Sequence, residues 1–135
     1  MKTLVSLIAV GCLIAGAAAA SAGGDLSKDK EINDGLLIMA VAEKIQRECS
    51  SIGGRLGRAR SFASKLEEQA MARGYTKAEI DAYVRDDYAK YRVREKRNDY
   101  FQSKGASDED AASLCVLGRD EIARGSSIGY LLRAK

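Results

Sequence analysis

The chain has 135 residues, with 22 Lys and Arg against 19 Asp and Glu, so its formal net charge is +3. It contains no His, which is the commonest general base and the commonest metal ligand in proteins, and it contains no Pro or Trp. The length allows one domain with or without a targeting segment, and the charge is too small to indicate a nucleic-acid partner by itself.

The N-terminus has the layout of a secretory signal peptide. Lys2 precedes an apolar run, and a tail of small residues follows that run. We therefore expect residues 1–22 to be a signal peptide that is cleaved after Ala22, or alternatively after Ala20, which places the mature protein in the periplasm. An uncleaved anchor is the other interpretation, because the run is nearly long enough to span a bilayer, but its last third is only weakly apolar. Cys12 would suggest a lipoprotein, yet the apolar run continues beyond it.

Cys49 and Cys115 are the cysteines of the mature chain. Their even number in an oxidising compartment favours a disulfide between them. The loop that this bond would close is long. By the loss of chain entropy in the unfolded state, the bond would stabilise the folded protein by at most about 4 kcal/mol. Two separate buried thiols are the alternative.

The mature chain reads as helix throughout. Ala is abundant, β-branched residues are few and Pro is absent, and this composition favours helices over strands. Apolar residues recur at helical spacing in four segments, which we expect to be helices over about 29–49, 52–73, 77–103 and 107–125. A short last helix follows, capped by Ser126 or Ser127, and residues 23–30 are expected to be loose.

Short connections between these helices favour antiparallel neighbours. We therefore predict an all-α fold, a small up-and-down bundle of about four helices plus a short C-terminal helix, in a single domain over residues 31–133 with one disulfide. Local signals mark the helix boundaries. Gly74 is expected to end the second helix in a left-handed backbone conformation, and Thr76 with Glu79 is expected to form a capping box at the start of the third. The end of the first helix and the start of the fourth lie at the same end of such a bundle, which makes the disulfide sterically reasonable.

Residues with catalytic or metal-binding chemistry are sparse. Without His, a metal site would need clustered carboxylates, and the candidates are Asp86 with Asp87 and the acidic run 108–110. Adjacent residues on a helix point apart, and acidic residues are expected where a helix begins. The glycine-rich segment 53–57 lacks the preceding strand and the Gly-Lys-Ser/Thr ending of a phosphate-binding loop. We therefore expect no catalytic residue, no metal and no cofactor, and we predict that the protein is not an enzyme.

The densest basic stretch lies in the third expected helix, with tyrosines interleaved. It could form a nucleic-acid or anionic-lipid surface. A helical projection places its cations on two sides of the helix. One side holds Lys90, Arg94 and Arg97, and the opposite side holds Arg92 and Lys96. Neighbouring acidic residues dilute both groups, so we interpret the stretch as a solvated helix face. We expect no nucleic-acid partner, and membrane contact only through the signal peptide.

The apolar face of the same helix is partly polar. Asp87 falls between Tyr83 and Tyr91 on the inward arc, whereas Asp86 falls outside it. Because buried polar groups need partners, we predict an internal ion pair between Asp87 and a cation of another helix, with Arg119 as the first choice. Alternatively, the stripe is half exposed or is covered by a partner protein.

The end of the chain carries a family resemblance. Residues 115–132 read Cys-Val-Leu-Gly-Arg-Asp-Glu-Ile-Ala-Arg-Gly-Ser-Ser-Ile-Gly-Tyr-Leu-Leu. This run resembles the C-terminal signature of a family of small exported alphaproteobacterial proteins, known only as domain of unknown function 5333. The N-terminal part of that family is matched by Ile32, Asn33, Asp34, Ile45 and Cys49. The resemblance covers about residues 31–132. It implies a helical periplasmic protein whose two cysteines act as a unit, and it implies no activity.

Two classes of function remain open. The small size, the missing catalytic residues and the polar stripe favour a non-enzymatic periplasmic interaction protein with a protein partner, such as an accessory protein of an envelope or respiratory complex. A small periplasmic stress or chaperone-like protein is the alternative, by analogy of fold alone.

Overall fold

A computed structural model describes residues 23–135; the predicted signal peptide and its cleavage at Ala22 lie outside the described residues. The described chain is mostly helical, which confirms the all-α class. Its elements in order are η1 (Leu26–Lys28), α1 (Lys30–Glu48), β1 (Ile52–Gly54), α2 (Leu56–Ala72), α3 (Lys77–Arg85), α4 (Asp87–Ser103), α5 (Ala111–Arg124), α6 (Ser127–Tyr130) and β2 (Leu132–Ala134).

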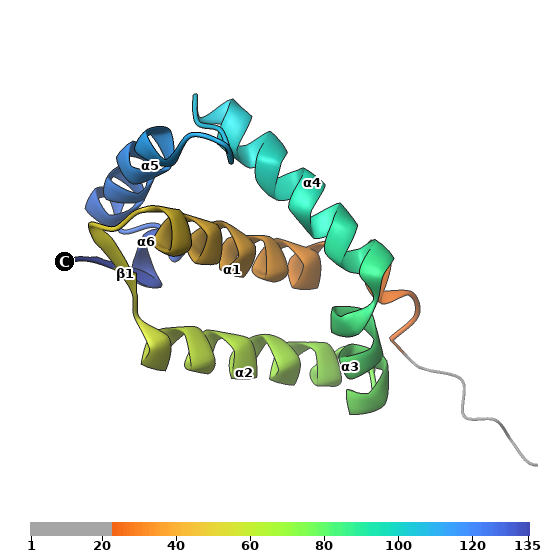
Figure 1. The fold of residues 1–135 in the computed structure, drawn as a ribbon. Coiled ribbons are helices and arrows are strands. Elements are labelled where there is room, and N and C mark those ends of the chain that lie inside the picture. Colours follow the sequence, from red (N-terminus) through yellow and green to blue (C-terminus); the bar gives the residue numbers. More distant parts are fainter. Residues whose placement is uncertain (1–22) are drawn as a thin grey trace, which may run out of the picture.

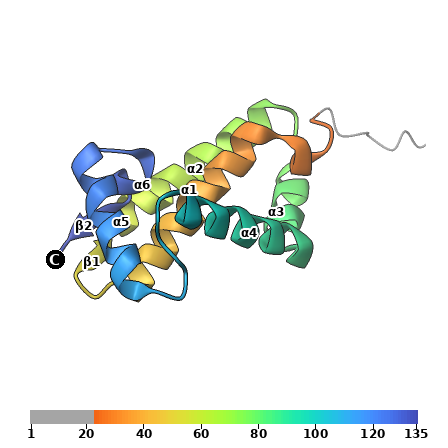
Figure 2. The same cartoon turned by 90° about the horizontal axis from the view of Figure 1, so that it is seen from above.

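Helix α1 is the centre of the molecule. Figure 1 shows it between α2 on one side and α4 on the other. It also contacts α5, α6 and β1, so nearly every element packs against it. Helix α3 joins α2 to α4 at one end, and α5, α6 and the two strands gather at the opposite end (Figure 2).

Two hydrophobic cores lie along α1. We call the larger one the disulfide core; its buried residues are Val41, Ala42, Ile45, Cys49, Ile52, Phe101, Ala106, Leu114, Leu117, Ile128, Leu131 and Leu132. We call the smaller one the N-terminal core; its buried residues are Leu26, Ile32, Leu66, Ala70, Tyr75 and Ile80. The half-buried side chain of Met39 packs against both cores and connects them.

The predicted disulfide is present. Cys49 follows the last residue of α1 and bonds Cys115 in α5, with the two Cα atoms 5.3 Å apart. The sequence did not predict the strands beside it. Ile52 pairs with Ala134 in an antiparallel ladder, so the second expected helix begins only at Leu56.

The third expected helix is two helices. The backbone of Asp86 is extended, and its side chain accepts a hydrogen bond of 2.7 Å from the amide of Ala89, which makes Asp86 the N-cap of α4. The predicted capping box before α3 is confirmed, because Thr76 and Glu79 exchange both of its hydrogen bonds. The predicted stop at Gly74 is also confirmed by its positive φ of 96°.

Residues 23–30, expected to be loose, are structured in part. Leu26 is buried in the N-terminal core and begins the short helix η1. The side-chain amide of Asn33 donates to the carbonyl of Leu26 at 2.8 Å, and Asp29 is the N-cap of α1. The apolar anchor Leu26, the N-cap Asp29 of α1 and the N-cap Asp25 of η1 therefore hold a segment whose polar composition suggested a flexible tail.

Two buried glycines allow α5 to pack closely against its neighbours. A Cβ atom on Gly118 would collide with the side chains of Ile45 and Ile52, and one on Gly129 would overlap the backbone carbonyl of Glu121. Larger residues at these positions would force α5 away from α1, β1 and α6. The disulfide core is therefore tightly constrained by backbone contacts as well as by side chains.

Candidate functional site

Three adjoining cavities run along one side of α1. A cavity of about 310 Å³ lies between α1, α2 and α3, and one of about 320 Å³ lies between α1, α3 and α4. A third, of about 190 Å³, lies between α1, the start of α2 and β2. Leu36 lines the first two, Met39 lines the first and third, and Glu43 lines the second and third. The cavities therefore adjoin one another, and we call them together the α1 groove.

The floor of the α1 groove is apolar. Leu36 and Met39 of α1 are only half-buried, although Leu36 packs against the N-terminal core and Met39 packs against both cores. Val84 of α3 borders two of the three cavities and is exposed. Apolar side chains that a monomer leaves open in a concave site are typical of a binding surface.

One side of the groove is basic. The cavity between α1 and α4 is lined by Arg47, Lys90, Arg94 and Arg97, and Glu43 is the one acidic residue among its described lining residues. Arg47 pairs with Glu43 at 3.2 Å, and Lys90 pairs with the exposed Asp87 at 3.4 Å. Arg94 makes no hydrogen bond or ion pair within residues 23–135, so its charge is open to a ligand.

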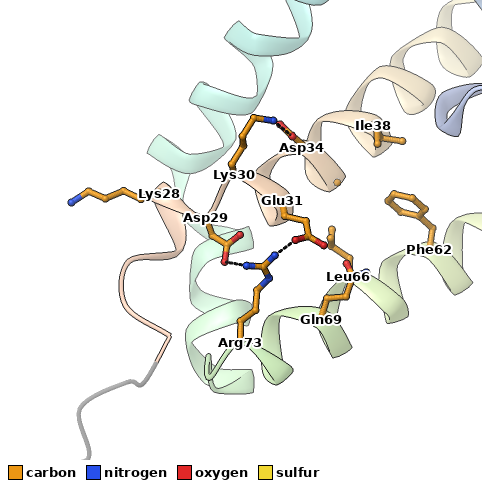
Figure 3. Close-up of a pocket in the computed structure, with 11 residues that line it drawn as sticks. Lys28, Asp29, Lys30, Glu31, Asp34, Ile38, Phe62, Leu66, Gln69 and Arg73 are labelled. Atoms are coloured by element: carbon orange, nitrogen blue, oxygen red, sulfur yellow. Dashed lines mark hydrogen bonds and ion pairs between the residues drawn. The ribbon is translucent and has the colours of Figure 1, made fainter.

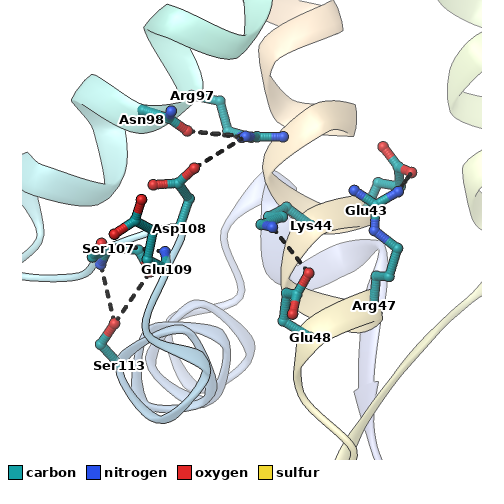
Figure 4. Close-up of polar contacts among 10 residues, drawn as sticks. All are labelled: Glu43, Lys44, Arg47, Glu48, Arg97, Asn98, Ser107, Asp108, Glu109 and Ser113. Atoms are coloured by element: carbon teal, nitrogen blue, oxygen red, sulfur yellow. Dashed lines mark hydrogen bonds and ion pairs between the residues drawn. The ribbon is translucent and has the colours of Figure 1, made fainter.

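Arg97 is the buried cation of this cavity. Only 8% of the residue is exposed, and Figure 4 shows its side chain extending from α4 towards α1. Its guanidinium donates twice to the side-chain oxygen of Asn98, at 3.1 and 3.0 Å. Its ion pair with Asp108 is long, at 3.8 Å. A buried charge with a distant counter-ion is costly, so a carboxylate placed in the cavity would be stabilised by Arg97.

Tyr83 is fixed at the edge of the groove by a polar network. Its hydroxyl donates to the side chain of Asn33 at 2.6 Å and accepts from Arg92 at 3.3 Å. The amide of Asn33 in turn donates to the carbonyls of Leu26 and Asp29. Burial is the main cause that raises the pKa of Tyr83 above its usual value. This network holds the tyrosine ring, which lines two of the three cavities, in one position.

A wider depression of about 630 Å³ lies near the start of α1 (Figure 3). Its charges are already paired. Arg73 forms ion pairs with Glu31 and, at 3.6 Å, with Asp29, and Lys30 pairs with Asp34. With its cations and anions compensating each other, this depression offers a ligand less than the α1 groove does.

The predicted ion pair between Asp87 and Arg119 was wrong. The Asp87 side chain is 100% exposed and contacts Lys90, while Arg119 is exposed on α5. The error follows from the break at Asp86, because a projection that assumed one continuous helix gave the residues after the break a false phase. The buried cation on α4 is Arg97, which the projection had assigned to a solvated face.

A buried carboxylate that the sequence analysis missed ties α4, α5 and α6 together. Glu121 is 1% exposed, and both Tyr100 and Ser126 donate hydrogen bonds from their hydroxyls to its carboxylate. Arg124 pairs with it at 2.6 Å. Burial, followed by the contact with Glu121, raises the pKa of Tyr100 to about 12. Glu121 lies seven residues after Leu114 on the apolar stripe, a signal that could have revealed it.

Within residues 23–135, the structure offers no cluster of three or more Cys, Asp or Glu side chains that could hold a metal ion. No helix in that range combines the length and apolar character needed to cross a membrane.

Comparison with known proteins identifies a family. No curated protein and no solved structure matches the chain. The model of a family described as a family of unknown function (DUF5333) matches residues 24–133, which is nearly the whole described chain. The disulfide and every lining residue of the α1 groove lie inside this match. The protein therefore belongs to the family of unknown function DUF5333.

Proposed function

We propose that this protein is an exported, non-enzymatic interaction protein that binds a partner protein in its α1 groove. The observation that carries the proposal is the groove itself, with an apolar floor and with the cations Arg94 and Arg97 on one side. Export rests on the signal-peptide pattern of residues 1–22. A role as an accessory protein of an envelope or respiratory complex would use such a groove to dock on another subunit.

The shape and charge of the groove favour an amphipathic helix with acidic residues as the occupant. Residues of α1 from Ile32 to Arg47 line the groove, which corresponds to a length of about 22 Å at the rise of an α-helix. A row of adjoining apolar cavities suits a helix that lays its apolar face along them. Acidic side chains on one flank of that helix would meet Arg94 and Arg97, which lack close carboxylate partners.

A stress or chaperone-like protein is the alternative, since it would use the same open apolar floor. It would bind many unfolded clients through apolar contacts, without a need for acidic residues at fixed positions. The basic side of the groove favours one complementary partner over many unrelated ones.

Site-specific crosslinking in cells would test this proposal. A photoreactive residue at Val84, inside the groove, should capture one stoichiometric partner through an acidic amphipathic segment. The same residue at Met71, which is apolar and exposed but does not line the groove, is the matched control and should capture none. The variant Arg94→Glu should reduce capture at Val84 at least about tenfold by charge reversal. Many unrelated crosslinked products would favour the chaperone-like alternative. Equal capture at Met71 would contradict the proposal that the partner binds in the α1 groove.

A further inference from the structure

We propose that the strand end of the molecule binds the surface of an anionic lipid bilayer. This end, which we call the basic end, consists of residues 49–60 and 125–135. It includes β1, the start of α2, α6 and β2, and it lies opposite α3 (Figure 2). Leu56 of this end also lines the third cavity of the α1 groove, but the cations that carry the inference line none of the three cavities.

The basic end holds all of the excess positive charge of the described chain. Its two segments carry five basic residues and no acidic ones: Arg55, Arg58, Arg60, Arg133 and Lys135. The rest of residues 23–135 has 16 basic against 19 acidic side chains, so it is net negative. The low overall charge therefore conceals a strong polarisation between the two ends of the protein.

The small sheet brings the two acid-free segments together. Gly53 of β1 lies opposite Arg133 of β2 in the ladder. A Cβ atom on Gly53 would lie 3.2 Å from the side chain of Lys135 and 3.5 Å from that of Arg133. Both cations therefore extend across the same face of β1, over a glycine that leaves room for them.

Two further cations are held at this end by backbone contacts. Arg55 donates from its side chain to the carbonyl of Leu132 at 3.0 Å. Arg58 donates to the carbonyl of Tyr130 at 3.2 Å, and its guanidinium carbon lies 4.4 Å from the centre of the Tyr130 ring. These contacts satisfy donors without neutralising charge, so both guanidinium groups remain cationic and exposed.

The acidic residues of neighbouring elements do not cancel this charge. On α1, Glu48 pairs with Lys44 at 2.9 Å and Glu43 pairs with Arg47. On α5, the buried Glu121 is engaged by Arg124, and the exposed Asp120 is a single acid against the five cations of the basic end.

Exposed apolar groups favour a bilayer over an acidic protein or a nucleic acid. Leu56 is 68% exposed and Tyr130 is 49% exposed at this end. Cations beside an exposed leucine and tyrosine are typical of surfaces that sit at the lipid headgroups, where the apolar groups enter the interface. Each Lys or Arg near an anionic bilayer contributes an attraction that salt weakens.

Vesicle co-sedimentation of the chain beginning at residue 23 tests this inference. We expect binding to phosphatidylcholine vesicles that contain about 30 mol% phosphatidylglycerol, no binding to pure phosphatidylcholine, and release at about 0.5 M salt. The double variant Arg133→Gln with Lys135→Gln should weaken binding about tenfold or more. The double variant Lys28→Gln with Lys30→Gln changes the net charge equally at the other end and should leave binding unchanged.

Three results would overturn the inference. The first is no binding to anionic vesicles at about 0.05 M salt. The second is an equal loss of binding in both double variants, which would make net charge alone responsible. The third is tighter binding to polyglutamate or RNA than to anionic vesicles, with the same dependence on Arg133 and Lys135, which would assign the basic end to another class of partner. None of these outcomes depends on whether the α1 groove binds a helix.

Discussion

The two cores of this protein are built differently, although one helix runs through both. In the disulfide core, Ile45, Cys49, Ile52 and Leu114 are fully buried, and a covalent bond and a two-stranded ladder close its edge. In the N-terminal core, the large side chains keep some exposure and the α1 groove opens beside them. The difference indicates a rigid half that holds α1 in place and an adaptable half. The α1 groove extends over both, because its third cavity is lined by Ala42, Leu131 and Leu132 of the disulfide core.

Truncation of one leucine in each core should give the largest contrast. Leu114→Ala removes a fully buried side chain from the disulfide core and should lower the free energy of unfolding by about 4 kcal/mol. Leu66→Ala removes a side chain that already borders a cavity, and it should cost only about 2 kcal/mol. Urea unfolding measures both, and equal costs would show that the two cores are equally well packed.

Loss of the disulfide should have the next largest effect. Replacing Cys49 and Cys115 by Ser should lower the free energy of unfolding by about 3 kcal/mol, because the bond constrains a 66-residue separation in the unfolded chain. The far-UV spectrum should remain helical. Thiol titration of the denatured, unreduced chain from residue 23 is the preliminary check, and two reactive thiols would rule out the bond.

High pH should weaken the disulfide half through Tyr100. The pKa of Tyr100 is raised from 10.0 to about 12 in the folded protein, so folded Tyr100 keeps a proton that the unfolded chain loses. Stability contributed by this group is present below about pH 10 and is lost as the pH rises towards about 12. Urea unfolding as a function of pH should show this decline, and Tyr100→Phe should reduce its slope. An unchanged slope would mean that Tyr100 ionises alike in both states.

The smallest contrast concerns two neighbouring acids at the start of α4. Asp86→Ala removes the N-cap hydrogen bond to Ala89 and should cost about 1 kcal/mol. Asp87→Ala removes a fully exposed side chain and should cost less than about 0.5 kcal/mol. Thermal melts of the two variants would check the order, and the reverse order would restore one continuous helix across this point.

Features that depend on local chemistry were predictable from the sequence. The capping box of Thr76 and Glu79 and the stop at Gly74 each depend on residues within one turn of the chain. The disulfide followed from two cysteines in an expected oxidising compartment.

Features that depend on distant contacts were not predictable. The strand at Ile52–Gly54 has three residues, two of them glycines, and exists only because Leu132–Ala134 pairs with it. The break at Asp86 has no Pro or Gly to mark it. A projection of one continuous helix therefore gave α4 the wrong phase and placed the buried Arg97 on a solvated face. The basic end was hidden for the same reason, because its two segments are far apart in the sequence and meet only in the folded protein.

Native-state hydrogen exchange tests the division into two halves most directly. We expect amides of α5 in the disulfide core, such as that of Leu117, to exchange only through global unfolding. Amides of α3 beside the α1 groove, such as that of Val84, should exchange at least about tenfold faster through a local opening that urea hardly affects. If the amides of α3 and α5 instead exchange at the same free energy and with the same urea dependence, the protein is one cooperative unit and the account of a rigid and an adaptable half is contradicted.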